Sequence, residues 1–181
     1  MSFACKSKQE KTDKKPFFPV LSFINSQVAH IDTSLYSIKK IIYIDSVRSD
    51  TEYIHRENFR SIAKDFLEIP DLADKKYRSR FTEESMFDES MNRVILTYKP
   101  VNPEKEEITV QEVLISPGQG TEDKVMSIII DRVISNRDGY LQKNMLWQVD
   151  RYFQVTTTRQ KPGQPETTTI MKVTWNEEET E

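Results

Sequence analysis

The second half of the chain is a series of short strand-like runs, each closed by a turn, with no helical pattern between them. The runs are rich in β-branched and aromatic residues, and segments containing proline or glycine, such as 100–103 and 162–165, separate them. Strands joined by short turns pair antiparallel, because a parallel connection needs a long crossover. The expected strands cover 76–87, which is the weakest, then 93–99, 107–116, 124–134, 140–159 and 166–175.

The first half of the chain shows a different periodicity. Apolar residues recur every three to four positions from Phe17 to Ile31, which predicts an amphipathic helix over 17–31. Residues 36–45 are β-branched and aromatic and predict a strand. Ser49 and Glu52 have capping-box spacing, and they predict the start of a second helix over about 52–68 that Pro70 ends.

This order of elements predicts an α+β fold, in which two N-terminal helices are packed on a curved antiparallel sheet of five to six strands. The order is similar to that of cystatin-like and nuclear-transport-factor-like folds, where a curved sheet wraps around helices. A lipocalin-like barrel, with the strands closed and the N-terminal helix beside one end, is the alternative.

The 181 residues are enough for one domain with a substantial core. We expect a flexible tether over 1–15, a single α+β domain over 16–176 and an acidic tail over 177–181. The net charge of −3 is spread without a large basic face, which argues against nucleic-acid binding. The sequence contains no apolar run of the length that spans a bilayer.

The single cysteine, Cys5, follows the small residue Ala4 and precedes a polar, lysine-rich segment. This arrangement resembles the mature start of a bacterial lipoprotein, in which the cysteine carries the lipid and a tether holds a folded domain off the membrane. The resemblance implies attachment to a membrane through a lipid at Cys5. The alternative is a free thiol near the N-terminus of a cytosolic protein.

Longer runs, among them FINSQVAHIDTSLYSI, KDFLEIPDL, MLWQVDRYFQV and QKPGQPETTTIMKVTWNE, resemble those of uncharacterised exported lipoproteins of Gram-negative bacteria. The resemblance implies a place in the cell envelope, facing the periplasm or exposed on the outer membrane, with the cytoplasm as the alternative. It carries over no activity. We therefore expect a domain that binds a partner protein or a small ligand without catalysis. The alternatives are an enzyme with a pocket between sheet and helices and a cytosolic interaction domain.

The most aromatic run contains the candidate ligand-binding residues. On strand alternation, Trp147, Arg151 and Phe153 share one face of the expected strand, and Gln148 lies on the other. The simpler interpretation is that Trp147 and Phe153 belong to the core. The functional interpretation is that their face lines a pocket in which Arg151 or Gln148 orients a ligand.

The remaining motifs favour structural roles. His30 and His55 have no neighbours at metal-ligand spacing, so we expect no metal, and no cofactor motif is present. The G-x-G at 118–120 predicts a hairpin turn because a strand, not a helix, follows it. Acidic residues around 45–57 are explained by the expected helix start. Threonine triplets at 156–158 and 167–169 predict the solvated end of a hairpin.

Overall fold

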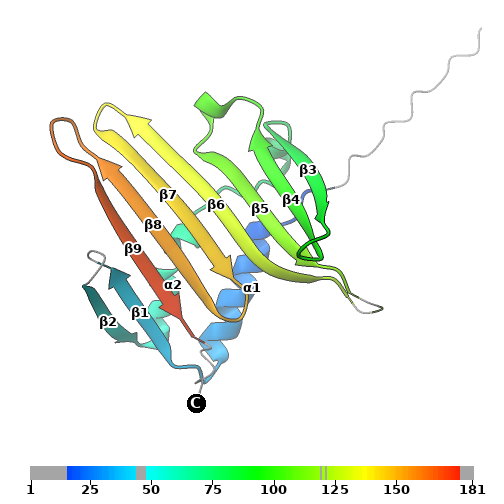
Figure 1. The fold of residues 1–181 in the computed structure, drawn as a ribbon, viewed down its shortest axis with the longest axis horizontal. Helices are drawn as coiled ribbons and strands as arrows, with labels where there is room; N and C mark the ends of the chain where they lie inside the picture. Colours follow the sequence, from blue (N-terminus) through cyan, green and yellow to red (C-terminus); the bar gives the residue numbers. More distant parts are fainter. Residues whose placement is uncertain (1–15, 44–47, 119, 121, 176–181) are drawn as a thin grey trace, which may run out of the picture.

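Nine antiparallel strands form one open sheet in the computed structural model, which describes residues 16–43, 48–118, 120 and 122–175. Their order across the sheet is β2-β1-β9-β8-β7-β6-β5-β4-β3 (Figure 1). The strands are β1 (Ile38–Tyr43), β2 (Ser49–Ile54), β3 (Phe81–Asp88), β4 (Arg93–Pro100), β5 (Ile108–Ser116), β6 (Lys124–Asn136), β7 (Gly139–Gln148), β8 (Tyr152–Gln160) and β9 (Thr167–Thr174).

Most of the sheet is an up-and-down meander. Strands β3 to β9 each pair with the next strand along the chain, and the N-terminal hairpin β1–β2 then joins the far side of β9. The β1–β9 pairing is the one contact in the sheet between strands distant in sequence, and its register places Lys40 opposite Val173. The sheet therefore ends in two edge strands, β2 and β3.

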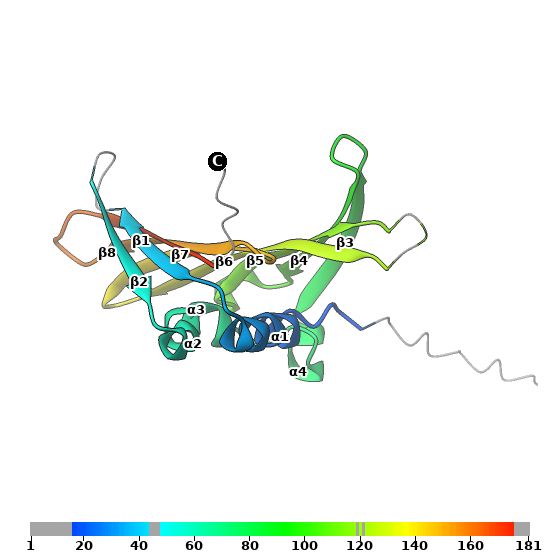
Figure 2. The same cartoon turned by 90° about the horizontal axis from the view of Figure 1, so that it is seen from below.

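The helices α1 to α4 lie together on one face of the sheet (Figure 2). The longest, α1, runs over Val20–Thr33, and its buried residues Val20, Ile24, Val28 and Ile31 form one stripe at helical spacing. The other helical elements are single turns: η1 (Arg56–Asn58), α2 (Phe59–Ile62), α3 (Lys64–Leu67), α4 (Lys75–Arg78) and η2 (Pro103–Lys105). Within the described ranges, no helix is both long and apolar enough to cross a membrane.

A cluster of aromatic rings fills the space between the helices and the centre of the sheet. Trp147 and Phe153 lie opposite each other on β7 and β8, and their rings stack with centroids 5.4 Å apart. Phe59 and Phe66 from the helical segment, together with Trp175 after β9, surround this pair with centroids 5.2–6.5 Å from the Trp147 ring. All five side chains are buried, so the cluster joins the helical segment to β7, β8 and the end of β9.

Tyr98 connects the N-terminal segment to the edge of the sheet. Its ring is fully buried, and its hydroxyl accepts a hydrogen bond from the backbone N–H of Phe18 at 3.1 Å. Burial raises the pKa of the Tyr98 hydroxyl well above its usual value, and Glu83, which accepts a hydrogen bond from that hydroxyl, adds to the rise. The hydroxyl therefore stays protonated and holds β3, β4 and the start of α1 together.

The expected fold class is wrong in the balance of strand and helix and in predicting a second long helix. The molecule is mostly a nine-stranded open sheet, with one long helix and several single turns, instead of two helices on a sheet of five to six strands. The expected cystatin-like and nuclear-transport-factor-like order, with two helices before five to six strands, is not seen, because only α1 is longer than a single turn and the sheet has nine strands. The closed lipocalin-like barrel is not seen because β2 and β3 end the sheet without pairing to each other. The first helix and the antiparallel pairing are confirmed.

Three local errors account for the difference. The segment expected to start a helix at 52 forms β2, and the helical turns that follow it are broken at Ala63. The run 140–159, expected as one long strand, is the hairpin β7–β8, with a turn at Val149–Arg151 in which Asp150 adopts φ 60°. Residues 76–78, expected as the start of a strand over 76–87, instead belong to α4.

Candidate functional site

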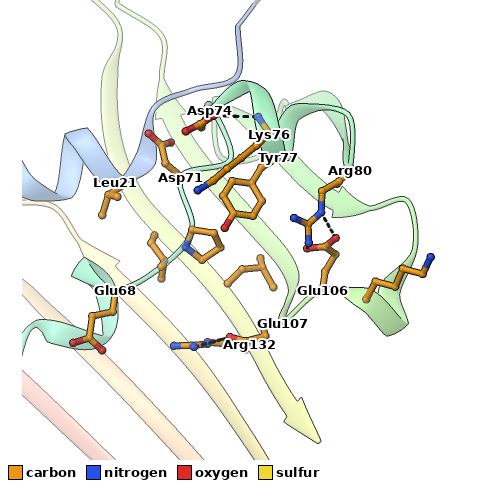
Figure 3. A pocket seen from close by; sticks show the side chains of 14 residues that line it. Leu21, Glu68, Asp71, Asp74, Lys76, Tyr77, Arg80, Glu106, Glu107 and Arg132 are labelled. Atoms are coloured by element: carbon orange, nitrogen blue, oxygen red, sulfur yellow. Dashed lines mark hydrogen bonds and ion pairs between the residues drawn. The ribbon is translucent and has the colours of Figure 1, made fainter.

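A cleft of about 590 Å³ opens between the helical segment and the sheet, at the end of the molecule where α4 meets β5 and β6 (Figure 3). Its lining comes from α1, the segment after α3, α4, the segment around η2, β5 and β6. We call these residues the end cleft: Leu21, Glu68, Ile69, Pro70, Asp71, Asp74, Lys76, Tyr77, Arg80, Lys105, Glu106, Glu107, Ile108 and Arg132. The volume lies in the range of small-molecule sites.

The inner wall of the end cleft is apolar. Ile69 and Ile108 belong to the buried core, and Leu21 and Tyr77 pack against that core while remaining partly exposed. The Tyr77 ring projects into the opening (Figure 3). Two cations lie against this ring, with Lys76 Nζ 4.8 Å and the Arg80 guanidinium 5.0 Å from its centre. The cleft thus combines an apolar wall with positive charge held beside an aromatic ring.

Two arginines at the rim bind adjacent glutamates. Arg80, between α4 and β3, makes a bidentate contact with Glu106, with Nε–Oε1 and Nη2–Oε2 distances of 2.5 and 2.6 Å. Arg132 on β6 donates from Nε and Nη2 to one oxygen of Glu107. Glu106 and Glu107, which lead into β5, therefore neutralise two arginines from distant parts of the chain.

The aspartates of the end cleft shape its loop. Asp71 Oδ1 accepts a hydrogen bond from the backbone N–H of Ala73, and Asp74 Oδ1 accepts one from Lys76 at the start of α4. These are the side-chain-to-backbone bonds that set turns and short helix starts. Next to the cleft, Lys143 on β7, opposite Arg132, forms an ion pair with Asp65 of α3 and fastens the helical segment to the sheet.

Three charged side chains of the end cleft, Lys76, Lys105 and Glu68, have neither an ion pair nor a side-chain hydrogen bond among the described residues. Lys76 places its ammonium over Tyr77, in front of Asp71, and Glu68 extends from the end of α3 at the other side of the opening (Figure 3). The arrangement offers one positive and one negative group on either side of an apolar wall. Chemically, it can bind a molecule with opposite charges at its ends.

The sequence-predicted residues lie away from this cleft. Trp147 and Phe153 are fully buried in the aromatic cluster. Gln148 ends β7 with its amide donating to the carbonyl of Met126, and Arg151 is exposed in the following turn. The structure brings Trp147 and Phe153 together and places Gln148 and Arg151 elsewhere, which favours the core interpretation of the two aromatic side chains.

Other motifs have the following positions. His30 and His55 are exposed, and nowhere in the described part of the chain do three histidine, cysteine, aspartate or glutamate side chains form a group that could hold a metal ion. Asp50 and Glu52 lie on β2 instead of at a helix start, and Asp45 lies outside the described residues. The G-x-G segment joins β5 to β6, as predicted for a hairpin. The threonine triplets pair across β8 and β9, with a 3.2 Å contact between the hydroxyls of Thr158 and Thr168.

The end cleft was missed because its residues come from four separate stretches of the sequence, at position 21, over 68–80, over 105–108 and at position 132. None of these stretches contains a known motif, and lysines and glutamates in loops are ordinarily solvated.

Cys5, the tether over 1–15 and the acidic tail over 177–181 lie outside the described residues. Comparisons with protein-family models, curated proteins and solved structures give no match.

Proposed function

We propose that the chain is a binding domain without catalytic activity, and that the end cleft takes a small amphipathic molecule with one positive and one negative group. The observation that carries this proposal is the apolar wall with an unpaired ammonium and an unpaired carboxylate at its sides, Lys76 and Glu68. A ligand of this kind buries its apolar body against Ile69, Pro70 and Tyr77 while both charges find partners.

The engagement of the other charged groups supports binding over catalysis. Glu106 and Glu107 are held by arginines, and Asp71 and Asp74 accept backbone N–H groups. A general acid or base must be within hydrogen-bonding reach of its substrate and must be free to exchange a proton. Carboxylates fixed in ion pairs and turns are suited to keeping a cleft in shape, so the cleft is preorganised for binding.

Three dipeptide probes with the same apolar body test the charge requirement. Leucyl-leucine carries both charges, leucyl-leucinamide carries the positive charge alone, and N-acetyl-leucyl-leucine carries the negative charge alone. We expect the zwitterion to bind about tenfold more tightly than either of the others, because one charge-assisted contact is worth ~1.5 kcal/mol. Titrations followed by amide chemical shifts of the labelled protein would measure this and show which residues respond.

Lys76→Gln is expected to weaken the zwitterion and the acetylated probe while leaving the amidated probe unchanged. Lys161→Gln in the exposed β8–β9 turn removes the same charge far from the cleft and serves as the matched control. Equal affinity for all three probes, or shifts confined to residues outside the end cleft, would contradict the proposal.

We further propose that this domain is held at a membrane of the cell envelope by a lipid on Cys5, facing the periplasm or the cell surface. The support is the sequence around Cys5, in which a small residue precedes the cysteine and a polar segment follows it. A tethered binding domain keeps its ligand or partner protein close to the membrane without spanning it.

Intact mass measurement of the membrane fraction tests the anchor. The gene with its natural upstream sequence is expressed in a Gram-negative host, and we expect a chain that begins at Cys5 with a diacylglycerol group and an acyl chain. Cys5→Ser is expected to lose the modification and leave the membrane fraction. An unmodified chain in the soluble fraction would instead support the cytosolic alternative.

A further inference from the structure

Strand β3 presents an open backbone edge at one end of the sheet (Figure 1). The backbone N–H of Val101 donates to the carbonyl of Arg80, one step beyond Phe81 and Pro100, the first pair of the β3–β4 register. Hydrogen-bonded and non-hydrogen-bonded pairs alternate along an antiparallel ladder. Glu83, Ser85 and Phe87 therefore direct their N–H and C=O groups away from β4, toward the open side.

Two large apolar side chains are exposed at the end of this edge. Met86 is 60% exposed and Phe87 is 51% exposed, although they are neighbours in a strand and so point to opposite faces of the sheet. A flat partner surface could cover only one of them. A strand added to the open edge lies beside both faces at once, and its alternating side chains can cover Met86 and Phe87 together.

Acidic side chains follow the same two-faced pattern. Glu83 shares a face with Phe87, and Glu84 shares a face with Met86. Asp88 and Glu89 add negative charge at the tip. Glu84 forms an exposed ion pair with Lys99 on β4 at 3.5 Å, and Glu83 accepts a hydrogen bond from Tyr98, so the cations of β4 offset only part of the charge of this edge. Each face of the edge thus offers one acidic and one apolar position, which complements a segment carrying one basic and one apolar residue on each face.

The hairpin that carries this edge is ordered before any partner binds. Asp88 accepts hydrogen bonds from the backbone N–H of Ser90 at 2.9 Å, from the Ser90 hydroxyl at 2.6 Å and from the backbone N–H of Met91 at 3.3 Å. The Ser90 hydroxyl and these N–H groups hold the pKa of Asp88 below its ordinary value. A preorganised edge loses little conformational entropy on binding.

The opposite edge, β2, lacks this combination. Of its two acidic residues, Asp50 and Glu52, the second is bound to Lys40 at 2.6 Å, and Tyr53 is its one exposed large apolar side chain among the described residues. Charged edge strands ordinarily discourage pairing with other chains. On β3, Glu83 and Glu84 occupy one half of the edge and Met86 and Phe87 occupy the other. This division favours a partner strand with basic residues in one half and apolar residues in the other.

We infer that the open edge of β3 accepts an extended segment of a partner protein by antiparallel strand addition. In that segment two adjacent apolar residues lie opposite Phe87 and Met86, one residue intervenes, and two adjacent basic residues lie opposite Glu84 and Glu83. This interaction surface is separate from the end cleft and does not depend on the ligand proposed for it.

Two short peptides test the inference on the full chain. The first, Thr-Val-Val-Thr-Lys-Lys-Thr, follows the proposed pattern, and the second has both lysines replaced by glutamate. Fluorescence anisotropy of labelled peptides is expected to give at least about tenfold tighter binding for the lysine peptide, because two ion pairs are replaced by two like-charge contacts. Equal binding of the two peptides, or no binding of either, would overturn the inference without requiring any variant of the protein.

Ser85→Pro tests the backbone contribution. Proline at this position removes an outward N–H and leaves the ladder bonds to β4 in place, and edge strands tolerate proline there. Ser85→Thr keeps the N–H and is the matched control. We expect binding of the lysine peptide to be lost in the first variant and kept in the second, with the melting temperature recorded for both. Undiminished binding by a folded Ser85→Pro protein would show that strand addition is not the mode of binding.

Discussion

Replacement of Trp147 by alanine is expected to lower the free energy of unfolding by about 3–5 kcal/mol. Trp147 is fully buried, and its ring contacts those of Phe153, Phe66 and Trp175 at centroid distances of 5.2–5.4 Å. Removing it leaves a cavity where the helical segment, the centre of the sheet and the end of β9 meet. Urea unfolding monitored by circular dichroism would measure the loss.

One further variant at this position separates packing from hydrogen bonding, and a second variant at an exposed aromatic residue serves as the control. The Trp147 indole nitrogen is buried and has no hydrogen-bond partner among the described residues. Trp147→Phe therefore gives up ring volume but no hydrogen bond, and we expect it to cost less than half as much as Trp147→Ala. Tyr53→Ala, at an aromatic residue that is 72% exposed, is expected to stay within about 0.5 kcal/mol of the unmodified protein. A similar small loss for Trp147→Ala would show that the aromatic cluster does not hold the fold together.

The periodicity of the sequence predicted the elements whose burial is one-sided. Val20, Ile24, Val28 and Ile31 recur at helical spacing, and all four are buried on α1. The meander after β3 was also predictable, because proline and glycine mark the connections after β4, β5 and β8. In both cases the local signal and the tertiary environment favour the same structure.

The second predicted helix failed because tertiary pairing overrode a local signal. Ser49 and Glu52 have the spacing of a helix cap, yet this segment pairs with β1 over six residues and Glu52 binds Lys40 across the two strands. Cross-strand partners of this kind cannot be identified from a capping pattern. The missed β7–β8 turn has a different cause, since it contains neither glycine nor proline. Asp150 supplies the positive φ there, which aspartate tolerates better than most residues do.

The candidate site lay beyond prediction because its parts are distant in the sequence. Glu68 and Lys76 precede β3, whereas Arg132 lies on β6, and only the order of strands in the sheet brings them to one end of the molecule. The aromatic run at 147–153 was the most conspicuous local signal. In the structure this run belongs to the core. Aromatic residues line ligand sites as well as filling cores, so the run by itself could not distinguish the two.

Gly139→Ala is expected to be the most damaging single-methyl change in the sheet, lowering the free energy of unfolding by about 2–5 kcal/mol. Gly139 starts β7 with φ +136°, a backbone conformation that residues with a Cβ rarely adopt. An added Cβ would also lie 2.3 Å from the carbonyl oxygen of Gln160, the residue that ends β8. That contact is with backbone, so relief requires the end of the β7–β8 pairing to move.

Gly163→Ala separates the two contributions to this cost. Gly163, in the β8–β9 turn, also has a positive φ, of +71°, but an added Cβ there would meet nothing within 4 Å. We therefore expect a loss of about 1–2 kcal/mol from backbone strain alone. Thermal unfolding of both variants under the same conditions would compare them. Equal losses would mean that the clash with Gln160 contributes nothing, and that the turn between β6 and β7 does not lie against the end of β8 as the structure places it.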